Sequence, residues 1–562
     1  MLRRRTIQYL GLLFAAALLI HLYFISRSDL DSSHLSEWND SVDVQDPEPK
    51  GKLSAEPRKR DAVVAAFQYA WSAYERDAMG SDEYHPISHR GTNLSSSGGI
   101  GYTIVDAIDT MLLMGLHQEY SRASDWVRKS LRFDRDGRDR CFNTFETTIR
   151  VLGGLLSALH LSSDDMYLKH AVDLADRMLP AFDTPSGLPH TSVNLEARVG
   201  IPDAGSYIST AEATTLQLEF RDLAQLTKNT DYWYKAERVM EVVNSVRLPS
   251  NLAPISMNAN EGSFSQSDIR LGSRGDSYYE YLLECYLHKP CLSTHTRGSQ
   301  DRTEPVYLKM YEDAMQGIHD HLVHKTPTRK LTYIAELIPK GANWRTTWDL
   351  NHKQDHLVCF LAGSLMLGAT TAGARTGVVV SVPPKMDELT KKGQRDWKTG
   401  VDLLEGCMAT HETATGLSPE IVQFQPSADQ PNRDWYIKGS KPGGPAGYDA
   451  RYMLRPETVE SLFLAWRLTG NKRYREYAWG IFQAIEKHCR LADGGYATVL
   501  DVDTVPVRYD DKQETFYLSE TLKYLFLTFA DESVLPLDGY VLNTEAHPLP
   551  IFRPSIKPMF TL

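Results

Sequence analysis

The sequence predicts an all-α protein whose helices form a closed toroid of seven helical hairpins. Between residues 58 and 531, charged amphipathic segments alternate with segments richer in apolar and small residues, and seven such pairs follow one another. A helix that is apolar on most sides is a buried helix, so the second class should form an inner ring. Seven copies of one supersecondary unit favour ring closure, with an open helical solenoid as the alternative.

The expected helices follow directly from this alternation. Runs such as Leu152-Gly153-Gly154-Leu155-Leu156 show the apolar, small-residue character of the inner class. We expect outer helices at residues 59–77, 121–132, 164–179, 230–246, 304–324, 395–412 and 471–488. We expect inner helices at residues 103–116, 143–160, 210–227, 276–288, 355–369, 456–469 and 516–530.

The end of the chain can fill the axial opening that a closed ring leaves. Residues 539–542 have the pattern of a short strand, and Asn543-Thr544-Glu545-Ala546-His547-Pro548 follows. A threonine can offer a hard cation both its hydroxyl and its own carbonyl oxygen, and oxygen ligands suit Ca²⁺. Taken alone, this stretch is better explained as a polar turn that closes the fold.

The N-terminus has the features of a membrane anchor. Three arginines at residues 3–5 precede an apolar run over residues 7–25, which is just long enough to span a bilayer core. The positive flank favours a cytoplasmic tail at residues 1–6 and a luminal body. We therefore expect a type II signal anchor at 7–25 and a flexible luminal stem at 26–57. A cleaved signal peptide is the alternative, but Leu22-Tyr23-Phe24 stands where small residues would be expected.

Composition excludes some functions and sets the compartment. The net charge of −11 and the pI near 5.9 argue against a nucleic-acid partner. In an oxidising lumen, the cysteines at 141, 285, 291, 359, 407 and 489 are free to form disulfides. Asn39 and Asn93 begin sequons for N-glycosylation. We expect a monomer.

Acidic residues stand at the start of several inner segments. Asn143 with Glu146 and Ser209 with Glu212 fit capping boxes, and such patterns explain each acid singly. Because all inner helices of an alternating barrel run the same way, their N-termini should gather at one face. One opening would then be surrounded by Glu146, Glu212, Asp276 and Glu457, together with Arg150, Arg274 and Arg455.

Paired carboxylates in a cleft are what glycoside hydrolysis requires. One carboxylic acid donates a proton to the leaving oxygen, and a second carboxylate activates water. Nearby aromatic side chains offer faces for sugar rings, although core packing is the simpler explanation of any one of them. They are Phe145, Tyr278, Tyr279, Phe516 and Tyr517.

Longer motifs make the prediction specific. They are FETTIRVLGGL (145–155), DSYYEYLL (276–283), HLVCF (356–360), GLSPE (416–420), LRPETVES (454–461), SETLKY (519–524) and NTEAHP (543–548). In this order, across residues 58–550, they resemble the signatures of the class I α-mannosidases, glycoside hydrolase family 47. No single motif is specific, but the set is far beyond chance.

This resemblance implies a catalytic (αα)7 barrel over residues 58–550, plugged at one end by a C-terminal β-hairpin. It implies inverting removal of α-1,2-linked mannose from high-mannose N-glycans, with Ca²⁺ at the barrel floor. By motif, Thr544 is the Ca²⁺ ligand, Glu457 the general base, Glu146 the general acid and Asp276 a third carboxylate with a share in the acid role. The sugar pocket or the water shell of the calcium would be lined by Arg150, Glu212, His356, Arg455, Glu460, Phe516, Glu520 and Glu545.

The resemblance also implies a disulfide and a branch of the family. Cys359 and Cys407 match the paired cysteines of the family, whereas Cys285 is a departure that either bridges to Cys291 or stays a buried thiol. Arg274 resembles the endoplasmic-reticulum type, which removes one mannose from Man9GlcNAc2 to give Man8GlcNAc2 in glycoprotein quality control. This predicts residence in the endoplasmic reticulum membrane.

Alternatives remain open. They are a Golgi-type enzyme that removes several mannoses, and a mannose-recognising lectin of endoplasmic-reticulum degradation on the same scaffold. The sequence predicts no function for the C-terminal tail at residues 551–562.

Overall fold

The computed structural model describes residues 53–96, 98–134, 141–288, 305–341, 347–427, 434–439, 447–557 and 559–560. The chain divides into two compact units, residues 1–50 and 51–562, and all described residues belong to the second unit. The predicted cytoplasmic tail, signal anchor, Asn39, Cys291 and most of the stem lie outside the described residues. Within the described ranges, no helix combines the length and the apolar character needed to cross a bilayer.

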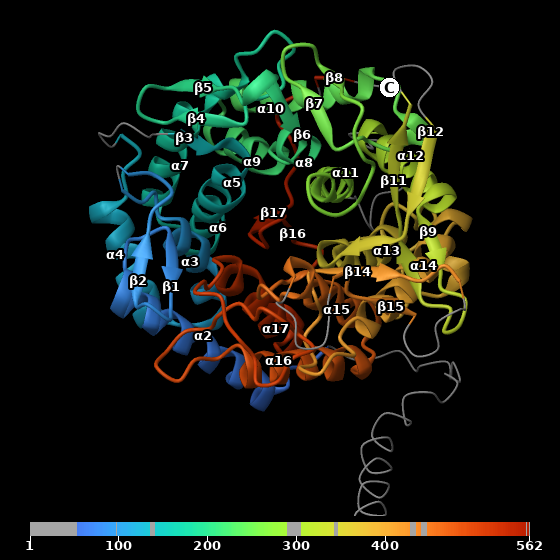
Figure 1. The fold of residues 1–562 in the computed structure, drawn as a ribbon. Coiled ribbons are helices and arrows are strands. Elements are labelled where there is room, and N and C mark those ends of the chain that lie inside the picture. Colours follow the sequence, from blue (N-terminus) through green and yellow to red (C-terminus); the bar gives the residue numbers. More distant parts are fainter. Residues whose placement is uncertain are drawn as a thin grey trace, which may run out of the picture. The chain divides into compact units, whose positions relative to one another are not determined.

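The described part of the second unit contains the two predicted classes of helix (Figure 1). The outer helices are α2 (Pro57–Ala78), α4 (His117–Ser130), α7 (Asp165–Met178), α10 (Thr230–Ser245), α12 (Pro305–His321), α14 (Lys391–Ala409) and α16 (Lys472–His488). The inner helices are α3 (Tyr102–Met114), α6 (Gly153–Ser162), α9 (Gln217–Thr227), α11 (Asp276–Leu287), α13 (Phe360–Thr370), α15 (Glu457–Thr469) and α17 (Leu522–Phe529).

The inner helices form a closed ring. Each contacts the next in chain order from α3 to α17, and the helical turn before α17 contacts α3. The contrast in burial follows the sequence pattern: α3 buries every residue from Tyr102 to Met111, whereas α4 buries only Ala123 and Val127. The closed ring agrees with the predicted toroid and excludes the open solenoid.

Glycines of the inner helices permit close packing. A Cβ atom on Gly363 of α13 would lie 2.9 Å from the Cα atom of Ser461 in α15. A Cβ atom on Gly153 would lie 2.6 Å from Nδ2 of Asn543, in the C-terminal segment. Small residues are therefore needed where inner helices approach each other and where the chain end enters the ring.

Three inner segments are less regular than the sequence pattern predicts. Residues 143–160 form α5 (Thr144–Glu146), a π-helical turn (Thr147–Leu152) and then α6. Residues 210–227 form α8 (Thr210–Thr214) and α9, which are interrupted at Thr215. A second π-helical turn (Tyr517–Thr521) precedes α17. Such π-helical turns occur frequently at functional sites.

Short strands, which the sequence analysis did not predict, occur in connections that lead from an outer helix to the next inner helix. With two to five residues each, they are too short for an alternating pattern to be recognised. Two-stranded sheets consist of β1 (Glu83–His85) and β2 (Arg90–Thr92), of β9 (Val323–Lys325) and β10 (Thr332–Ile334), and of β11 (Glu336–Lys340) and β12 (Thr347–Asn351). Three-stranded sheets consist of β3 (Cys141–Asn143), β4 (Ser192–Asn194) and β5 (Val199–Ile201), of β6 (Tyr207–Ser209), β7 (Ser256–Asn258) and β8 (Ser263–Phe264), and of β13 (Lys353–Asp355), β14 (Ile421–Phe424) and β15 (Trp435–Tyr436).

The C-terminal segment forms the predicted axial hairpin. Strands β16 (Tyr540–Leu542) and β17 (Pro548–Pro550) pair antiparallel, and they lie at the centre of the ring in Figure 1. Their connecting turn is closed by Asn543, whose Oδ1 accepts hydrogen bonds from the backbone of Glu545 (3.0 Å) and of His547 (2.8 Å). Ala546 in this turn has φ of +58°, which costs energy for a residue with a Cβ atom.

The packed body starts before residue 58 and continues after residue 550. Leu53 is buried, and the amide of Glu56 donates to the carbonyl of Phe529 at the end of α17 (2.8 Å). In the tail, Ile556 and Phe560 are buried. Residues on both sides of the predicted range 58–550 thus pack against the ring.

The described cysteines settle two of the questions about pairing. Cys359 and Cys407 form the predicted disulfide, which joins the segment before α13 to α14 across a sequence separation of 48. Cys285 is a buried free thiol beside Arg221. Cys489 is also buried and free, and Cys141 is exposed and free.

Candidate active site

A cavity of about 290 Å³ lies at the N-terminal ends of the inner helices. It is lined by every residue predicted for catalysis, sugar binding or metal binding except His356: Glu146, Arg150, Glu212, Arg274, Asp276, Arg455, Glu457, Glu460, Phe516, Glu520, Thr544 and Glu545. The parallel course of the inner helices therefore brings together acids that lie more than 300 residues apart in the chain. Thr544 and Glu545 reach the same cavity from the axial hairpin.

Arg150 is the most heavily paired cation of the cavity. Its Nε donates to Oε2 of Glu146 (2.8 Å), its Nη1 donates to Oγ1 of Thr515 (3.0 Å), and it also pairs with Glu545. The π-helical turn between Glu146 and α6 carries Arg150 into this position. The guanidinium therefore fixes Glu146 at one side of the cavity and Glu545 at its floor.

Glu457 has a free carboxylate oxygen. Its Oε2 is buried and has no hydrogen-bond partner in the described protein, and Nη1 of Arg455 lies 3.8 Å from its Oε1. Burial raises the pKa of Glu457 to about 7. Such a group can accept a hydrogen bond, and then a proton, from a water molecule in the cavity.

Arg455 is held in turn by a residue that the sequence analysis did not assign to the site. Its Nε donates to both carboxylate oxygens of Glu420 (3.1 Å each), and its Nη2 donates to Oε1 (2.6 Å). The ring of Phe516 lies between two guanidinium groups, with its centroid 5.4 Å from Arg455 and 5.8 Å from Arg150. These contacts fix an aromatic wall of the cavity.

The third predicted carboxylate begins α11. The amide of Ser277 donates to Oδ1 of Asp276 (3.0 Å), and burial raises the pKa of Asp276 to about 7. Arg274, two residues earlier, is exposed at the cavity mouth and has φ of +75°. Backbone strain in a residue other than glycine tends to cluster at ligand-binding sites.

The cavity floor carries an excess of buried negative charge. The hydroxyl of Thr544 hydrogen-bonds to Glu280, and burial raises the pKa of Glu280 to about 8. Burial and repulsion from neighbouring carboxylates raise the pKa of Glu460 and of Glu520 well above the usual range. Burial and nearby acids likewise raise the pKa of Glu545 to about 8, against the opposing effect of Arg150.

This floor fits a hard divalent cation. All its polar groups offer oxygen, which is the donor that Ca²⁺ prefers, and a positive ion would offset the mutual repulsion of the carboxylates. In the described residues, no group of three or more His, Cys, Asp or Glu side chains has an arrangement able to hold a metal ion.

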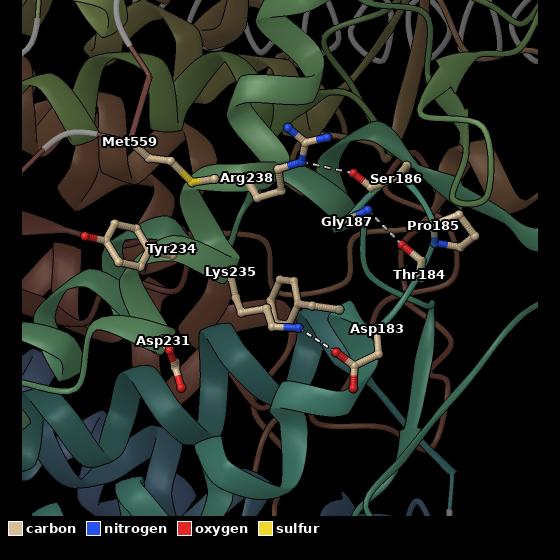
Figure 2. Close-up of a pocket in the computed structure, with 11 residues that line it drawn as sticks. Asp183, Thr184, Pro185, Ser186, Gly187, Asp231, Tyr234, Lys235, Arg238 and Met559 are labelled. Atoms are coloured by element: carbon tan, nitrogen blue, oxygen red, sulfur yellow. Dashed lines mark hydrogen bonds and ion pairs between the residues drawn. The ribbon is translucent and has the colours of Figure 1, made fainter.

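A second cavity of about 370 Å³ lies on the outer side of the ring, beside α10 (Figure 2). Its basic side chains are already paired: Lys235 with Asp183, and Arg238 with Glu241 and with the carbonyl of Ser186. None of the predicted site residues lies there. The convergent carboxylates identify the axial cavity as the candidate active site.

The comparison with known families agrees with this geometry. Residues 66–551 match glycosyl hydrolase family 47. The chain belongs to this family. The family 47 match begins within α2 and ends just after β17, so it includes the whole ring and the axial hairpin.

Named relatives of this family 47 enzyme are similar over most of their length. The chain is 39% identical to the endoplasmic reticulum mannosyl-oligosaccharide 1,2-alpha-mannosidase of Schizosaccharomyces pombe, over 98% of each chain. It is 38% identical to the protein of the same name from Homo sapiens, over 92% of this chain and 68% of that one. Its fold matches alpha-1,2-mannosidase from Trichoderma reesei with a TM-score of 0.74 and 28% identity, over 89% of this chain and all of that one.

One predicted site residue of the family 47 enzyme is displaced from the cavity. His356 is buried behind Glu457, with its Nε2 3.8 Å from Oε2 of Glu457 and 3.2 Å from Oγ1 of Thr458. It does not line the cavity. Burial lowers the pKa of His356 well below its usual value, so the ring is neutral. That His356 lines the sugar pocket or the water shell of the calcium stays a prediction, and its ring contacts the pocket residue Glu457 and its neighbour Thr458.

The sequence analysis missed two carboxylates that matter to the site. Glu280 follows Asp276 by four residues on one helix, so helical periodicity could have placed both on the same face. Glu420 lies in the GLSPE motif, but its pairing with Arg455 depends on a contact between distant segments. The structure also places the exposed Asn93 of the predicted sequon in the connection between α2 and α3.

Proposed function

We propose that this family 47 enzyme removes terminal α-1,2-linked mannose from high-mannose N-glycans with inversion at the anomeric carbon. One observation carries the proposal: the side chains of Glu146, Asp276 and Glu457 line a single cavity whose floor holds Thr544. The names of the Schizosaccharomyces and Trichoderma relatives support the same linkage. Inversion needs two carboxyl groups with room for a water molecule between them.

Glu457 is the general base in this proposal. Its unpaired, buried Oε2 accepts a proton from the attacking water. Arg455 lies close enough to favour the carboxylate form before the reaction, and it is itself held by Glu420. The neutral His356 behind Glu457 adds no competing charge.

Glu146 is the general acid in this proposal, and Asp276 shares the work of protonation. Two contacts orient Glu146. The side chain of Asn143 accepts a hydrogen bond from the backbone amide of Glu146 (2.8 Å), and Nε of Arg150 donates to its carboxylate (2.8 Å). Burial keeps Asp276 protonated to higher pH than an exposed aspartate, which suits a donor. The glycosidic oxygen receives the proton as the bond to the leaving sugar breaks.

Thr544 would hold Ca²⁺ through its hydroxyl and carbonyl oxygens, and Glu280, Glu460 and Glu520 would hold the surrounding water. The bound cation would supply a template that orients the sugar hydroxyls. Glu212 and Glu545 complete the polar wall of the pocket.

We further propose that the enzyme converts Man9GlcNAc2 mainly to one isomer of Man8GlcNAc2 in the endoplasmic reticulum. Arg274 supports this specificity because its guanidinium stands exposed at the mouth, where it can bind several sugar hydroxyls of one branch. Residues 7–25 would anchor the enzyme, with the catalytic body in the lumen. The sequons at Asn39 and Asn93 would be glycosylated there.

Digestion of Man9GlcNAc2, followed by mass spectrometry of the products, tests the proposal. One Man8 isomer is expected from the native protein, and an Arg274→Leu variant should give further trimming. Continued trimming by the native protein would favour a Golgi-type enzyme. Binding of Man9GlcNAc2 without any cleavage would favour a lectin.

A further inference from the structure

The connection between α13 and α14 presents an exposed apolar surface. Its aliphatic side chains point into solvent: Val378 is 42% exposed, Val379 67%, Val382 43% and Met386 46%. We call residues 375–392 the valine loop. An exposed cluster of this kind in a water-soluble body commonly marks a binding surface.

The valine loop is held in shape by its own hydrogen bonds. The carboxylate of Glu388 accepts from the amide of Ser381 (2.8 Å), from its hydroxyl (2.9 Å) and from the amide of Lys385 (3.0 Å). The amide of Arg375 donates to the carbonyl of Glu388 (2.9 Å). These bonds hold the loop backbone in a conformation in which Val378, Val379 and Val382 are exposed.

Basic side chains surround the exposed valines. Arg375, Lys385, Lys391 and Lys392 are exposed, and Asp387 is the one fully exposed acid of the loop. Lys392 pairs with Glu312 of α12, which leaves Arg375, Lys385 and Lys391 without a described ion pair. Nε of Arg375 donates to the carbonyl of Leu389 (3.2 Å). Aliphatic side chains with a basic rim are complementary to a phospholipid surface, where apolar groups enter below the phosphates.

The position of the valine loop supports the same partner. The loop follows the C-terminal end of α13, so it lies at the end of the ring opposite the cavity. The first described residues also lie at that end. The amide of Glu56 donates to the carbonyl of Phe529, the last residue of α17, and the amide of Glu532 donates to the carbonyl of Leu53. The expected stem therefore joins the body on the same side as the loop.

We propose that the valine loop is a second contact with the bilayer, in which its aliphatic side chains enter the headgroup region and its basic residues meet lipid phosphates. This rests on the anchor included in the proposed function. The anchor adds to the affinity of the loop, and we expect the loop to hold the body on vesicles also after the stem is cut.

This contact would orient the enzyme. With the valine loop on the bilayer, the cavity mouth at the opposite end faces the lumen, where glycoprotein substrates arrive. Without it, the body would rotate on its stem.

A cleavage experiment tests the contact. The full chain, with a protease site inserted in the stem, is reconstituted in vesicles of phosphatidylcholine and phosphatidylinositol and then cut. The released body should float with the vesicles, and a Val379→Asp/Val382→Asp variant should be retained at least several-fold less. A Val199→Asp variant is the matched control, because Val199 is 50% exposed in β5, among the connections at the cavity end.

The outcomes are distinct. Equal release of the native body and the Val379→Asp/Val382→Asp variant would overturn the proposal. Retention on native membranes but not on protein-free vesicles would overturn the choice of lipid as partner. Extraction of the uncut chain from the vesicles by alkaline carbonate would refute the anchor. In that case the valine loop is still tested, by adding the separately released body to vesicles and measuring its binding. Unchanged hydrolysis of Man9GlcNAc2 shows that each variant is folded.

Discussion

Nδ1 of His547 lies 2.7 Å from Oδ2 of Asp109, and both side chains are fully buried. The other ring nitrogen of His547 lies 3.1 Å from Oδ1 of Asp106, also on α3. Lys523 of α17 completes the cluster, since its Nζ donates to Asp109 (2.9 Å) and to the carbonyl of Ala546 (2.7 Å). The turn that carries Thr544 is thus fixed to the inner helices α3 and α17.

Loss of the imidazole should destabilise the protein in a pH-dependent way. Burial alone would lower the pKa of His547, but Asp109 and Asp106 raise it to about 9, compared with about 6.5 in an unfolded chain. The stabilisation is therefore complete below pH 6.5 and disappears as the pH rises through 9. We expect His547→Gln to lose roughly 3–5 kcal/mol at pH 6, and less at pH 9.

Urea unfolding at the two pH values measures this difference. His117→Gln is the control, because His117 is exposed at the start of α4. An equal loss at both pH values would show that His547 contributes through packing rather than through its charge.

Replacement of the proposed base should remove catalysis and spare binding. Glu457→Gln keeps the shape of the side chain but cannot take a proton, so kcat should fall by about 10²–10⁴-fold. Single-turnover kinetics and calorimetric titration with Man9GlcNAc2 separate the two effects. Glu119→Gln, in the outer helix α4, should behave like the native enzyme. Unchanged kcat in the Glu457 variant would refute the assignment.

Calcium should stabilise the fold through Thr544. A ligand that binds only the folded state at 100 times its Kd adds about 2.7 kcal/mol, so chelation should lower both Tm and activity. Thr544→Val removes the hydroxyl at nearly constant volume and should weaken Ca²⁺ binding in calorimetry. Thr504→Val, at an exposed threonine, should not. Full activity of the native enzyme after stringent calcium removal would contradict the metal site.

The disulfide should support stability more than chemistry. Cys359 and Cys407 close a loop across 48 residues, so their joint replacement by serine should cost roughly 3–4 kcal/mol. Activity at low temperature should persist, because neither sulfur lines the cavity. Denaturant titration measures the loss in the free energy of unfolding, with Cys141→Ser as the control. A large drop in kcat without a change in stability would point to a direct role in the site.

The ring could be predicted because its signal is local. Whether a helix is amphipathic or apolar all round can be read within some fifteen residues, and the outer helices α4 and α14 begin only four residues from their predicted starts. The shared direction of the inner helices then placed Glu146, Asp276 and Glu457 at one opening. The NTEAHP motif could be assigned to the axis because a closed ring requires a filler.

Other features depend on contacts between distant parts of the chain. Asp109 and His547 are 438 residues apart, and neither residue alone indicates that the other will neutralise it. Two contacts of the site arise in the same way. His356 packs behind Glu457, and Glu420 binds Arg455, only after the ring closes and brings their segments together. Sequence periodicity thus indicates which helix faces are buried, whereas the pairing of the buried charges follows from three-dimensional packing, because an unpaired charge in the core is too costly to remain.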